Sequence, residues 1–233
     1  MKIAIIPARG GSKRIPHKNI IPFCGHPLIH YPLSTAKKTG LFDKIHVSTD
    51  DDVIKQTVEA LGFEIDFMRD SKLADDYVGI LPVLRWVLEE YKAHGENYDE
   101  VCLILPTAPL IESSDIINAH DLFLAHAKQY SVLPVAAYPV PVEWAYQKLE
   151  FNHLVPERPG MFNIRSQDLE KKYYDSGTFV WFSAQQIMSD AISGDANFIA
   201  YVLDRHKAID IDDREDLEMA RLIKIGLESK NEN

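Results

Sequence analysis

Positively charged side chains and two adjacent glycines follow the first apolar run of the chain, which starts at Ile3. A short, continuous apolar run is typical of a strand buried on both faces of a parallel sheet. Glycines let backbone amides approach an anion without interference from a Cβ, and cations around the same turn neutralise its charge. The segment therefore predicts a cradle for a polyphosphate. Its residues are Arg9, Gly10, Gly11, Lys13, Arg14 and Lys18.

An ordinary glycine turn with solvated basic side chains is the alternative interpretation. Two features argue against it: the loop follows the first strand directly, and no acidic residue occurs before Asp43. The spacing fits neither the G-x-x-x-x-G-K-[ST] phosphate loop nor the G-x-G-x-x-G dinucleotide fingerprint. A kinase-like NTPase and a dehydrogenase are therefore both disfavoured.

A second set of chemical groups lies near the end of the chain, at residues 209–212, where isoleucine and aspartate alternate. On a strand, Asp210 and Asp212 would face the same side with their Cα atoms roughly 7 Å apart, close enough to address one Mg²⁺. Capping of the last helix is the alternative role; it suits Asp213 better, because Asp210 lies too early. A carboxylate pair and a basic loop together suffice for nucleotidyl transfer.

Other acidic and imidazole groups have structural explanations. Residues 50–52 are three aspartates after the second predicted strand, and an N-cap at Asp50 or Asp51 is favoured over direct metal chemistry. His26 and His30 have i,i+4 spacing, but a proline lies between them and no third ligand is near. We expect these histidines to be structural or surface residues.

Composition restricts the class of protein. The 233 residues, 46% of them hydrophobic, are enough for one large α/β domain, and the formal net charge of -10 disfavours a general nucleic-acid binder. Cys24 and Cys102 are too few for a disulfide framework. The first strand leaves no room for a signal peptide, and no apolar run approaches the roughly 20 residues of a membrane span. We expect a soluble, cytoplasmic protein without a membrane partner.

The elements that must position these groups alternate along the chain. Predicted strands lie at 3–7, 44–47, 63–68, 100–105, 131–138, 178–182, 198–202 and 207–211. Predicted helices lie at 28–38, 52–61, 80–91, 113–127, 184–189 and 214–227. This alternation implies βαβ crossovers and a mainly parallel sheet with ligands at the carboxyl ends of its strands. The basic loop, residues 48–51 and residues 106–109 all lie at that edge.

The rhythm of strands and helices breaks at about residues 139–174, where prolines and aromatic residues show no clear period. A long structureless loop is unusual in a compact domain. We expect this stretch to be a projecting lobe of the single domain 1–233, which contacts a second subunit or closes over substrate.

Four motifs together resemble the cytidylyltransferases that activate acidic sugars as CMP-sialic acids, with a likeness running from residue 3 to about 220. The motifs are Pro7–Asn19, Val47–Asp51, Pro106–Pro109 and Ile209–Asp212 followed by Asp216 and Leu217. The resemblance implies an α/β, Rossmann-like nucleotidyltransferase fold of three layers with a mainly parallel sheet and a small dimerisation lobe, and hence a homodimer. It also implies that the anomeric hydroxyl of a nine-carbon 2-keto acid sugar attacks the α-phosphate of CTP, and that pyrophosphate leaves.

The resemblance further implies roles for individual residues. Those expected to bind the nucleotide are Ala8, Arg9, Gly10, Gly11, Ser12, Lys13, Lys18, Asn19, Asp75, Pro106 and Thr107. Mg²⁺ would be held by Asp210 and Asp212, and the catalytic candidates are Lys18, Arg9 and Asp210. The sugar would contact Arg165, Gln167, Tyr174, Ser176 and Gly177.

Three positions depart from the sialic acid pattern. Ser166 replaces a second arginine, Leu105 replaces a glutamine, and Ser176 replaces an asparagine. Within the family, residues 165–177 look most like the enzymes that act on pseudaminic acid, and the loss of polar groups fits such a more apolar sugar. N-acetylneuraminic or legionaminic acid, and less readily an eight-carbon sugar acid, stay open as acceptors. A non-catalytic nucleotide-binding regulator is the alternative from another class.

Overall fold

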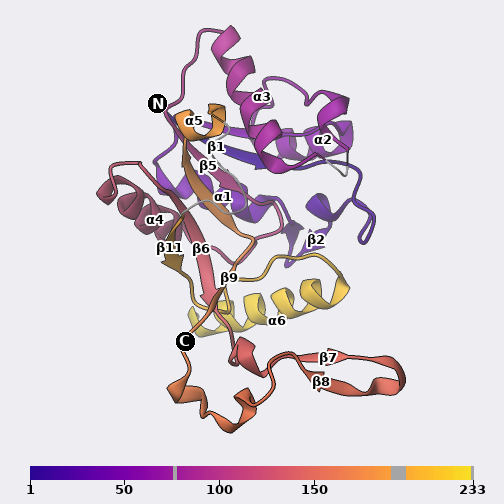
Figure 1. Cartoon of the computed structure of the whole chain (residues 1–233). Helices are drawn as coiled ribbons and strands as arrows, with labels where there is room; N and C mark the ends of the chain where they lie inside the picture. The colour runs from indigo at the N-terminus through magenta and orange to yellow at the C-terminus, as the bar shows by residue number, and fades with distance from the viewer. Residues whose placement is uncertain (76–77, 190–197, 232–233) are drawn as a thin grey trace.

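The computed structural model describes residues 1–75, 78–189 and 198–231, and its centre is a seven-stranded sheet (Figure 1). The strand order is β11-β6-β10-β5-β1-β4, and β9 pairs with β6. The strands are β1 (Lys2–Pro7), β4 (Lys44–Ser48), β5 (Glu100–Ile104), β6 (Ser131–Ala137), β9 (Tyr173–Asp175), β10 (Phe179–Ser183) and β11 (Phe198–Val202). Only β9 and β10 run against the others, so the prediction of a mainly parallel sheet is confirmed.

Helices cover both faces of this sheet and complete three layers. The covering helices are α1 (His30–Thr39), α2 (Asp52–Ala60), α3 (Ile80–Ala93), α4 (Ser113–Ala125) and α5 (Ala184–Met188). Ala4 and Ile6 of β1 pack in the core cluster that includes α1, α2 and α4, whereas Ile3 and Ile5 pack in the cluster that includes α3 and α5. The first strand is therefore buried on both faces, as its continuous apolar run predicts.

The last helix, α6 (Arg214–Asn231), packs apart from these two layers. Its Ala220 packs with Phe23, Leu110 and Ile211 in a separate cluster at the carboxyl ends of the central strands. Phe23 belongs to a small hairpin of β2 (Pro22–Phe23) and β3 (His26–Pro27). This cluster holds the segment that contains Asp210 and Asp212 against the rest of the domain.

Two predicted strands are absent, and in both cases apolar alternation has another cause. Residues 63–68 form no strand, since β4 ends the sheet and this segment only packs its apolar side chains onto the core. Residues 207–211 are likewise irregular, although Ile211 N–H donates to Thr107 O at 3.2 Å. Alternation of buried and exposed side chains does not by itself require a paired backbone.

Helix ends follow the predicted chemistry with one exception. Asp51 caps α2 by accepting from Val53 N and Ile54 N, and Asp213 accepts from the first amides of α6. The serines at the start of the helix predicted from residue 113 suggest a cap at Ser113 or Ser114, but the cap of α4 is Glu112, because a reciprocal capping box with Asp115 satisfies the first turn.

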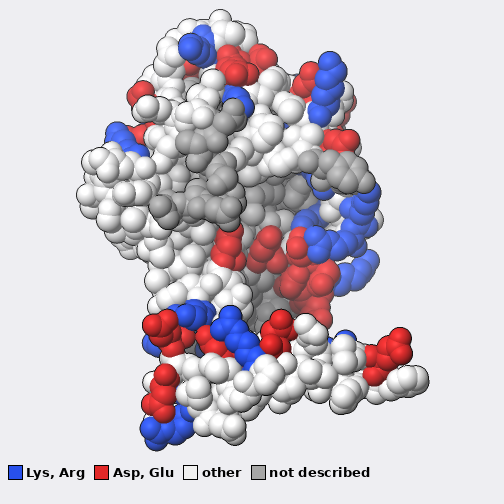
Figure 2. Space-filling view, in the orientation of Figure 1, with Lys and Arg blue, Asp and Glu red and all other residues white. Residues whose placement is uncertain are grey.

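Residues 138–172 leave the sheet between β6 and β9 and form a lobe that extends away from the domain (Figure 1). It carries a hairpin of β7 (Tyr146–Lys148) and β8 (Leu154–Pro156), and short 3-10 turns η3 (Val142–Trp144), η4 (Glu150–Asn152), η5 (Met161–Asn163) and η6 (Ser166–Asp168). Phe151 at the hairpin tip is 97% exposed. On the face shown in Figure 2 the hairpin is mostly free of charged side chains.

Short 3-10 turns also occur in the main domain, at η1 (Lys18–Ile20) and η2 (Ser71–Leu73). Among the described residues, no helix combines the length and apolar character needed to cross a bilayer.

Candidate active site

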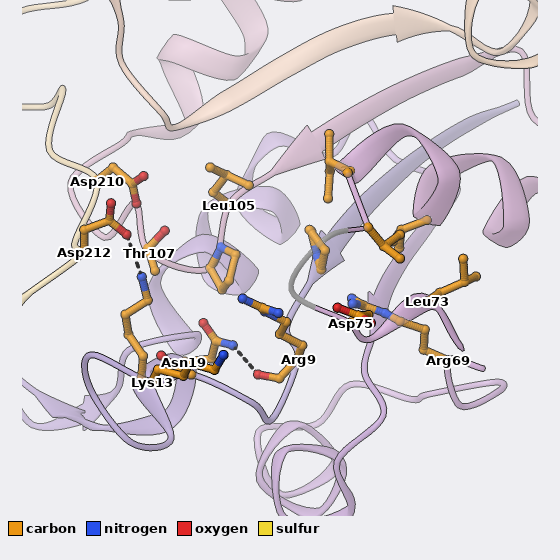
Figure 3. Close-up of a pocket in the computed structure, with 18 of the residues that line it drawn as sticks. Arg9, Lys13, Asn19, Arg69, Leu73, Asp75, Leu105, Thr107, Asp210 and Asp212 are labelled. Atoms are coloured by element: carbon orange, nitrogen blue, oxygen red, sulfur yellow. Dashed lines mark hydrogen bonds and ion pairs between the residues drawn. The ribbon is translucent and has the colours of Figure 1, made fainter. Parts of the chain in front are cut away.

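A cavity of about 560 Å³ opens at the carboxyl ends of β1 and β5, and it brings together the basic loop and the late aspartates. Asp210 and Asp212 lie on one side of it, and Arg9, Asp75 and Arg69 lie on the other (Figure 3). Figure 2 shows basic and acidic side chains gathered side by side on the flank of the molecule that carries β2. The arrangement can hold a ligand whose negative charge faces the basic loop and whose bound cation contacts Asp210 and Asp212.

The basic wall of the cavity is the loop after β1, which contributes Arg9, Lys13 and Lys18. The Asn19 side chain donates to Arg9 O at 3.0 Å and closes the loop on itself. Lys18 Nζ crosses to the opposite wall, where it donates to Ile211 O at 2.7 Å and to Asp212 Oδ1 at 3.1 Å. Lys18 therefore links the two walls as well as supplying charge to the cavity.

Gly10 has a packing role that differs from the predicted amide cradle. Its N–H donates to Asp50 Oδ1 at 3.1 Å, so this amide is used inside the protein. A Cβ at Gly10 would lie 2.9 Å from Asp51 Cβ and would also collide with the carboxylate that caps α2. Glycine is thus required here because the loop approaches a helix cap closely.

Asp212 is neutralised by the basic wall. Its Oδ1 lies 2.9 Å from Arg14 Nη2 and 3.1 Å from Lys18 Nζ. Burial by itself would raise the pKa of Asp212, but hydrogen bonding and charge attraction from Lys18, assisted by Arg14, bring the net pKa below its ordinary value. Asp212 is therefore a charged carboxylate held in place by two cations.

Asp210 has the opposite electrostatic environment. Burial raises its pKa, the nearby charge of Asp212 adds to the rise, and a hydrogen bond from Thr107 and the charge of Lys18 only partly oppose it. Its Oδ1 is buried without a hydrogen-bond partner. A buried oxygen without a partner is costly unless a ligand supplies one, and a hard cation is such a ligand.

Within the described parts of the chain, no three His, Cys, Asp or Glu side chains cluster as a metal cage. Two carboxylates in the same cavity as a cationic loop are a donor set that suits Mg²⁺ held jointly by protein and ligand phosphates. The residues present therefore fit a divalent cation that is completed by the ligand.

Most of the predicted nucleotide and metal residues line this one cavity. These are Arg9, Ser12, Lys13, Lys18, Asn19, Asp75, Pro106, Thr107, Asp210 and Asp212. Ala8, Gly10 and Gly11 do not line it, and Ala8 is fully buried with its N–H bonded to Ser48 O. Ala8 and Gly10 are used in contacts within the protein, whereas Gly11 is exposed, and contact of these three residues with the nucleotide stays a prediction.

None of the five predicted sugar residues lines the cavity. Arg165 and Gln167 are exposed on the lobe, where Arg165 pairs with Asp168 at 2.9 Å. Ser176 is buried, and its hydroxyl donates to Pro134 O at 2.8 Å. Tyr174 packs edge-on against Tyr138, and Gly177 lies against Asp210. In a single chain, these residues do not form one sugar pocket.

Arg69 is a charged cavity residue that was not predicted from the sequence. Its guanidinium donates to Ser48 O and Ser48 Oγ, and burial lowers the pKa of Arg69 to about 10, while Asp50 counteracts part of that shift. The available signal was a single arginine directly after an apolar run, which is the position of a strand's carboxyl end.

An apolar wall completes the cavity beside Arg69. It consists of Leu73, Val78, Ile80, Val83 and Leu105. A cavity with two charged walls and one apolar wall suits a ligand that carries both phosphates and an uncharged ring.

The fold and this cavity together define an α/β protein of the nucleotidyltransferase type. The cytidylyltransferase family model matches residues 3–220, and the chain belongs to this family of enzymes. The family expected from the four motifs is therefore confirmed.

The chain is similar to named proteins over nearly its whole length. It is 34% identical over 228 residues to the pseudaminic acid cytidylyltransferase of Campylobacter jejuni, covering 97% of this chain and 98% of that protein. It is 28% identical to the N-acylneuraminate cytidylyltransferase of Escherichia coli, covering 95% of this chain and 52% of that protein. The solved structure of CMP:2-keto-3-deoxy-manno-octonic acid synthetase complexed with CTP superposes with a TM-score of 0.70 at 16% identity, over 97% of this chain and 98% of that one.

Proposed function

We propose that this enzyme transfers the CMP group of CTP to the anomeric hydroxyl of pseudaminic acid and releases pyrophosphate. The observation that carries the proposal is the single cavity in which the cationic loop faces Asp210 and Asp212. Had the two sets of residues lain at opposite ends of the sheet, no single nucleotide could have met both.

The protein's own part in this reaction is positioning and charge stabilisation. Arg9, Lys13 and Lys18 are placed to counter the negative charge of the triphosphate, and the charge on the departing pyrophosphate grows as the reaction proceeds. Such preorganised cations act most strongly in a cavity that excludes water.

Mg²⁺ is the proposed cofactor, with Asp210 and Asp212 as its protein ligands. When bound, the ion would neutralise negative charge on the phosphates of the nucleotide. The unpartnered Asp210 Oδ1 and the shortage of further carboxylates in the described residues both support an ion shared with the nucleotide.

Pseudaminic acid is the preferred acceptor for two reasons. The similar Campylobacter jejuni protein carries that sugar in its name and matches this chain end to end. Leu105, which stands at the position of a glutamine in the sialic acid pattern, lines the cavity next to Pro106 and Thr107. An apolar side chain there suits an acceptor with fewer hydroxyl groups.

We further propose that two chains form a homodimer through the lobe at residues 138–172. Tyr146, Leu149, Phe151 and Leu154 are exposed apolar side chains on its hairpin, which is unusual on a lone surface element. Arg165 lies on the same lobe and outside its own cavity, so it could serve an acceptor only in a second chain.

The cytoplasm is the proposed location of the reaction. Cys24 and Cys102 are both free thiols, as a reducing compartment favours. The supply of CTP is also intracellular, which suits an enzyme that consumes it.

A sugar panel tests the reaction. Purified protein with CTP and Mg²⁺ is incubated separately with pseudaminic, legionaminic and N-acetylneuraminic acids and with an eight-carbon 2-keto acid, and pyrophosphate release is measured. We expect the fastest release with pseudaminic acid and a loss of roughly 10³-fold or more with Asp210→Asn. CTP binding without release from any sugar would instead favour a non-catalytic regulator.

Light scattering after gel filtration tests the dimer. We expect the wild-type chain to elute with twice the monomer mass, and a Phe151→Asp, Leu154→Asp double variant to elute as a monomer. A wild-type monomer at all concentrations assayed would contradict the role of the lobe.

A further inference from the structure

Resting on the proposed function, we propose that Gly177 is a positioning residue that sets the direction of the Asp210 carboxylate toward the cavity. This role differs from the sugar contact predicted for Gly177. It follows from how closely the backbone of the 175–178 loop approaches Asp210.

Gly177 leaves no room for a side chain on the face toward Asp210. A Cβ built there would lie 2.9 Å from both Cβ and Oδ2 of Asp210. Real Cβ atoms essentially never make contacts that short, so either the loop or the aspartate would have to move. The residue also has φ +60, a conformation that glycine adopts without strain.

The loop itself is held on all sides and is unable to yield easily. Ser176 N–H and Oγ both donate to Pro134 O, at 3.1 and 2.8 Å. Leu105 N–H donates to Thr178 O at 2.8 Å, and Gly177 N–H donates to Asp175 Oδ1 at 2.9 Å. A side chain added at Gly177 would therefore displace Asp210 rather than the loop.

In this contact we expect the Asp210 side chain to move more easily than the loop. Its segment is irregular and is held through Ile211, whose N–H donates to Thr107 O at 3.2 Å and whose carbonyl accepts from Lys18 Nζ at 2.7 Å. The carboxylate has Thr107 on one side and Gly177 on another, and its Oδ1 is left without a hydrogen-bond partner. A displaced carboxylate would present that oxygen in a different direction.

The test compares Gly177→Ala with Gly40→Ala. Gly40, the C-cap of α1, has φ +64 and nothing within 4 Å of its built Cβ, so this control carries the same backbone strain without the contact. Mn²⁺ binding in the presence of CTP and the absence of sugar is measured by electron paramagnetic resonance. Pyrophosphate release is then measured against Mg²⁺ and CTP concentration.

We expect Gly177→Ala to weaken Mn²⁺ binding by about tenfold or more, which is the usual loss when a residue that orients a metal ligand is changed. The Mg²⁺ concentration for half-maximal rate should rise by a similar factor. The KM for CTP at saturating Mg²⁺ should change by less than about threefold, since the basic wall is untouched. Gly40→Ala should match the wild type in all three measurements.

The outcomes separate this inference from the proposed function. Absence of pyrophosphate release from the wild type would defeat the function. An active wild type together with a Gly177→Ala variant that binds Mn²⁺ as Gly40→Ala does would overturn the positioning role. If Gly177→Ala fails to fold, Gly177→Asn replaces it, because asparagine tolerates positive φ; failure of both to fold would make Gly177 purely structural and also overturn the role.

Discussion

The two charged walls of the cavity are built in different ways. The basic wall follows β1, whose central residues are fully buried. Its loop is closed by two hydrogen bonds, from the Asn19 side chain to Arg9 O and from Gly10 N–H to Asp50 Oδ1. The acidic wall is an irregular segment that depends on other parts of the chain. The cations of the first wall therefore lie within one short loop, although Asp50 also anchors that loop from 40 residues away. The second wall is held by contacts with distant parts of the chain, such as the bond from Lys18 to Ile211 O.

The acidic wall also contains a second contrast. Asp212 has two cationic partners, while Asp210 Oδ1 has no hydrogen-bond partner. An aspartate that is paired stabilises the ligand-free protein, and one that is buried and unpaired costs stability until a cation arrives. The contrast indicates that Asp212 mainly connects the acidic and basic walls through ion pairs, whereas Asp210 mainly offers an oxygen to the ligand.

The largest expected effect comes from removing the Asp210 charge. Asp210→Asn keeps the shape of the side chain but loses a charged oxygen donor, so pyrophosphate release should fall by roughly 10³-fold or more. Steady-state assays with CTP, sugar and Mg²⁺ measure this. A loss below about tenfold would show that the acidic wall does not require this carboxylate.

The next effect concerns the lysine that links the walls. Lys18→Gln should lower kcat by about 10²-fold, because one preorganised charge in such a site is worth that much. Arg14→Gln is the matched control: Arg14 also pairs with Asp212, but its side chain is mostly exposed, so its loss should cost no more than a few-fold. Equal losses in the two variants would mean that both cations act only through Asp212.

A smaller effect is expected at Gly10 in the basic wall. Gly10→Ala places a Cβ against Asp51, so the loop should shift and the KM for CTP should rise by about tenfold. Gly11→Ala is the control, since a Cβ at Gly11 meets nothing within 4 Å. If both variants bind CTP as the wild type does, the close approach to the α2 cap does not set the loop position.

The smallest effect is on stability and distinguishes the two aspartates. In urea unfolding without ligand at neutral pH, Asp210→Asn should stabilise the protein by about 1 kcal/mol, because it removes an unpaired buried charge. Asp212→Asn should destabilise it by about 0.5–1 kcal/mol, because the ion pairs with Arg14 and Lys18 are lost. Destabilisation by both would contradict the contrast within the acidic wall.

The same measurement has a pH dependence with a definite sign. The pKa of Asp210 is raised in the folded protein, so its contribution to stability is present at low pH and is lost as pH rises through that folded pKa. The advantage of Asp210→Asn over the wild type should therefore grow between about pH 4 and pH 7 and vanish at the acid end. An advantage that shrinks as pH rises would reverse the assignment.

Much of the fold and half of the site could be predicted because their signals are local. Neighbours within a few residues determine the apolar strand after Lys2, the helix caps at Asp51 and Asp213, and the cluster of cations after β1. The strands at 63–68 and 207–211 could not be predicted correctly, since apolar alternation records burial and not pairing. Arg69 was missed because its role depends on the distant Ser48 carbonyl.

By itself, the sequence determined which chemistry is available: four cations after a buried strand, two late carboxylates, and motifs typical of a cytidylyltransferase. Only the tertiary structure decided how that chemistry is shared out. In the folded protein, Asp212 forms ion pairs with Lys18 and Arg14, Asp210 Oδ1 has no hydrogen-bond partner, and Gly177 packs against Asp210. The physical reason is that residue type sets charge, whereas burial and the partners brought by distant segments set what each charge can do.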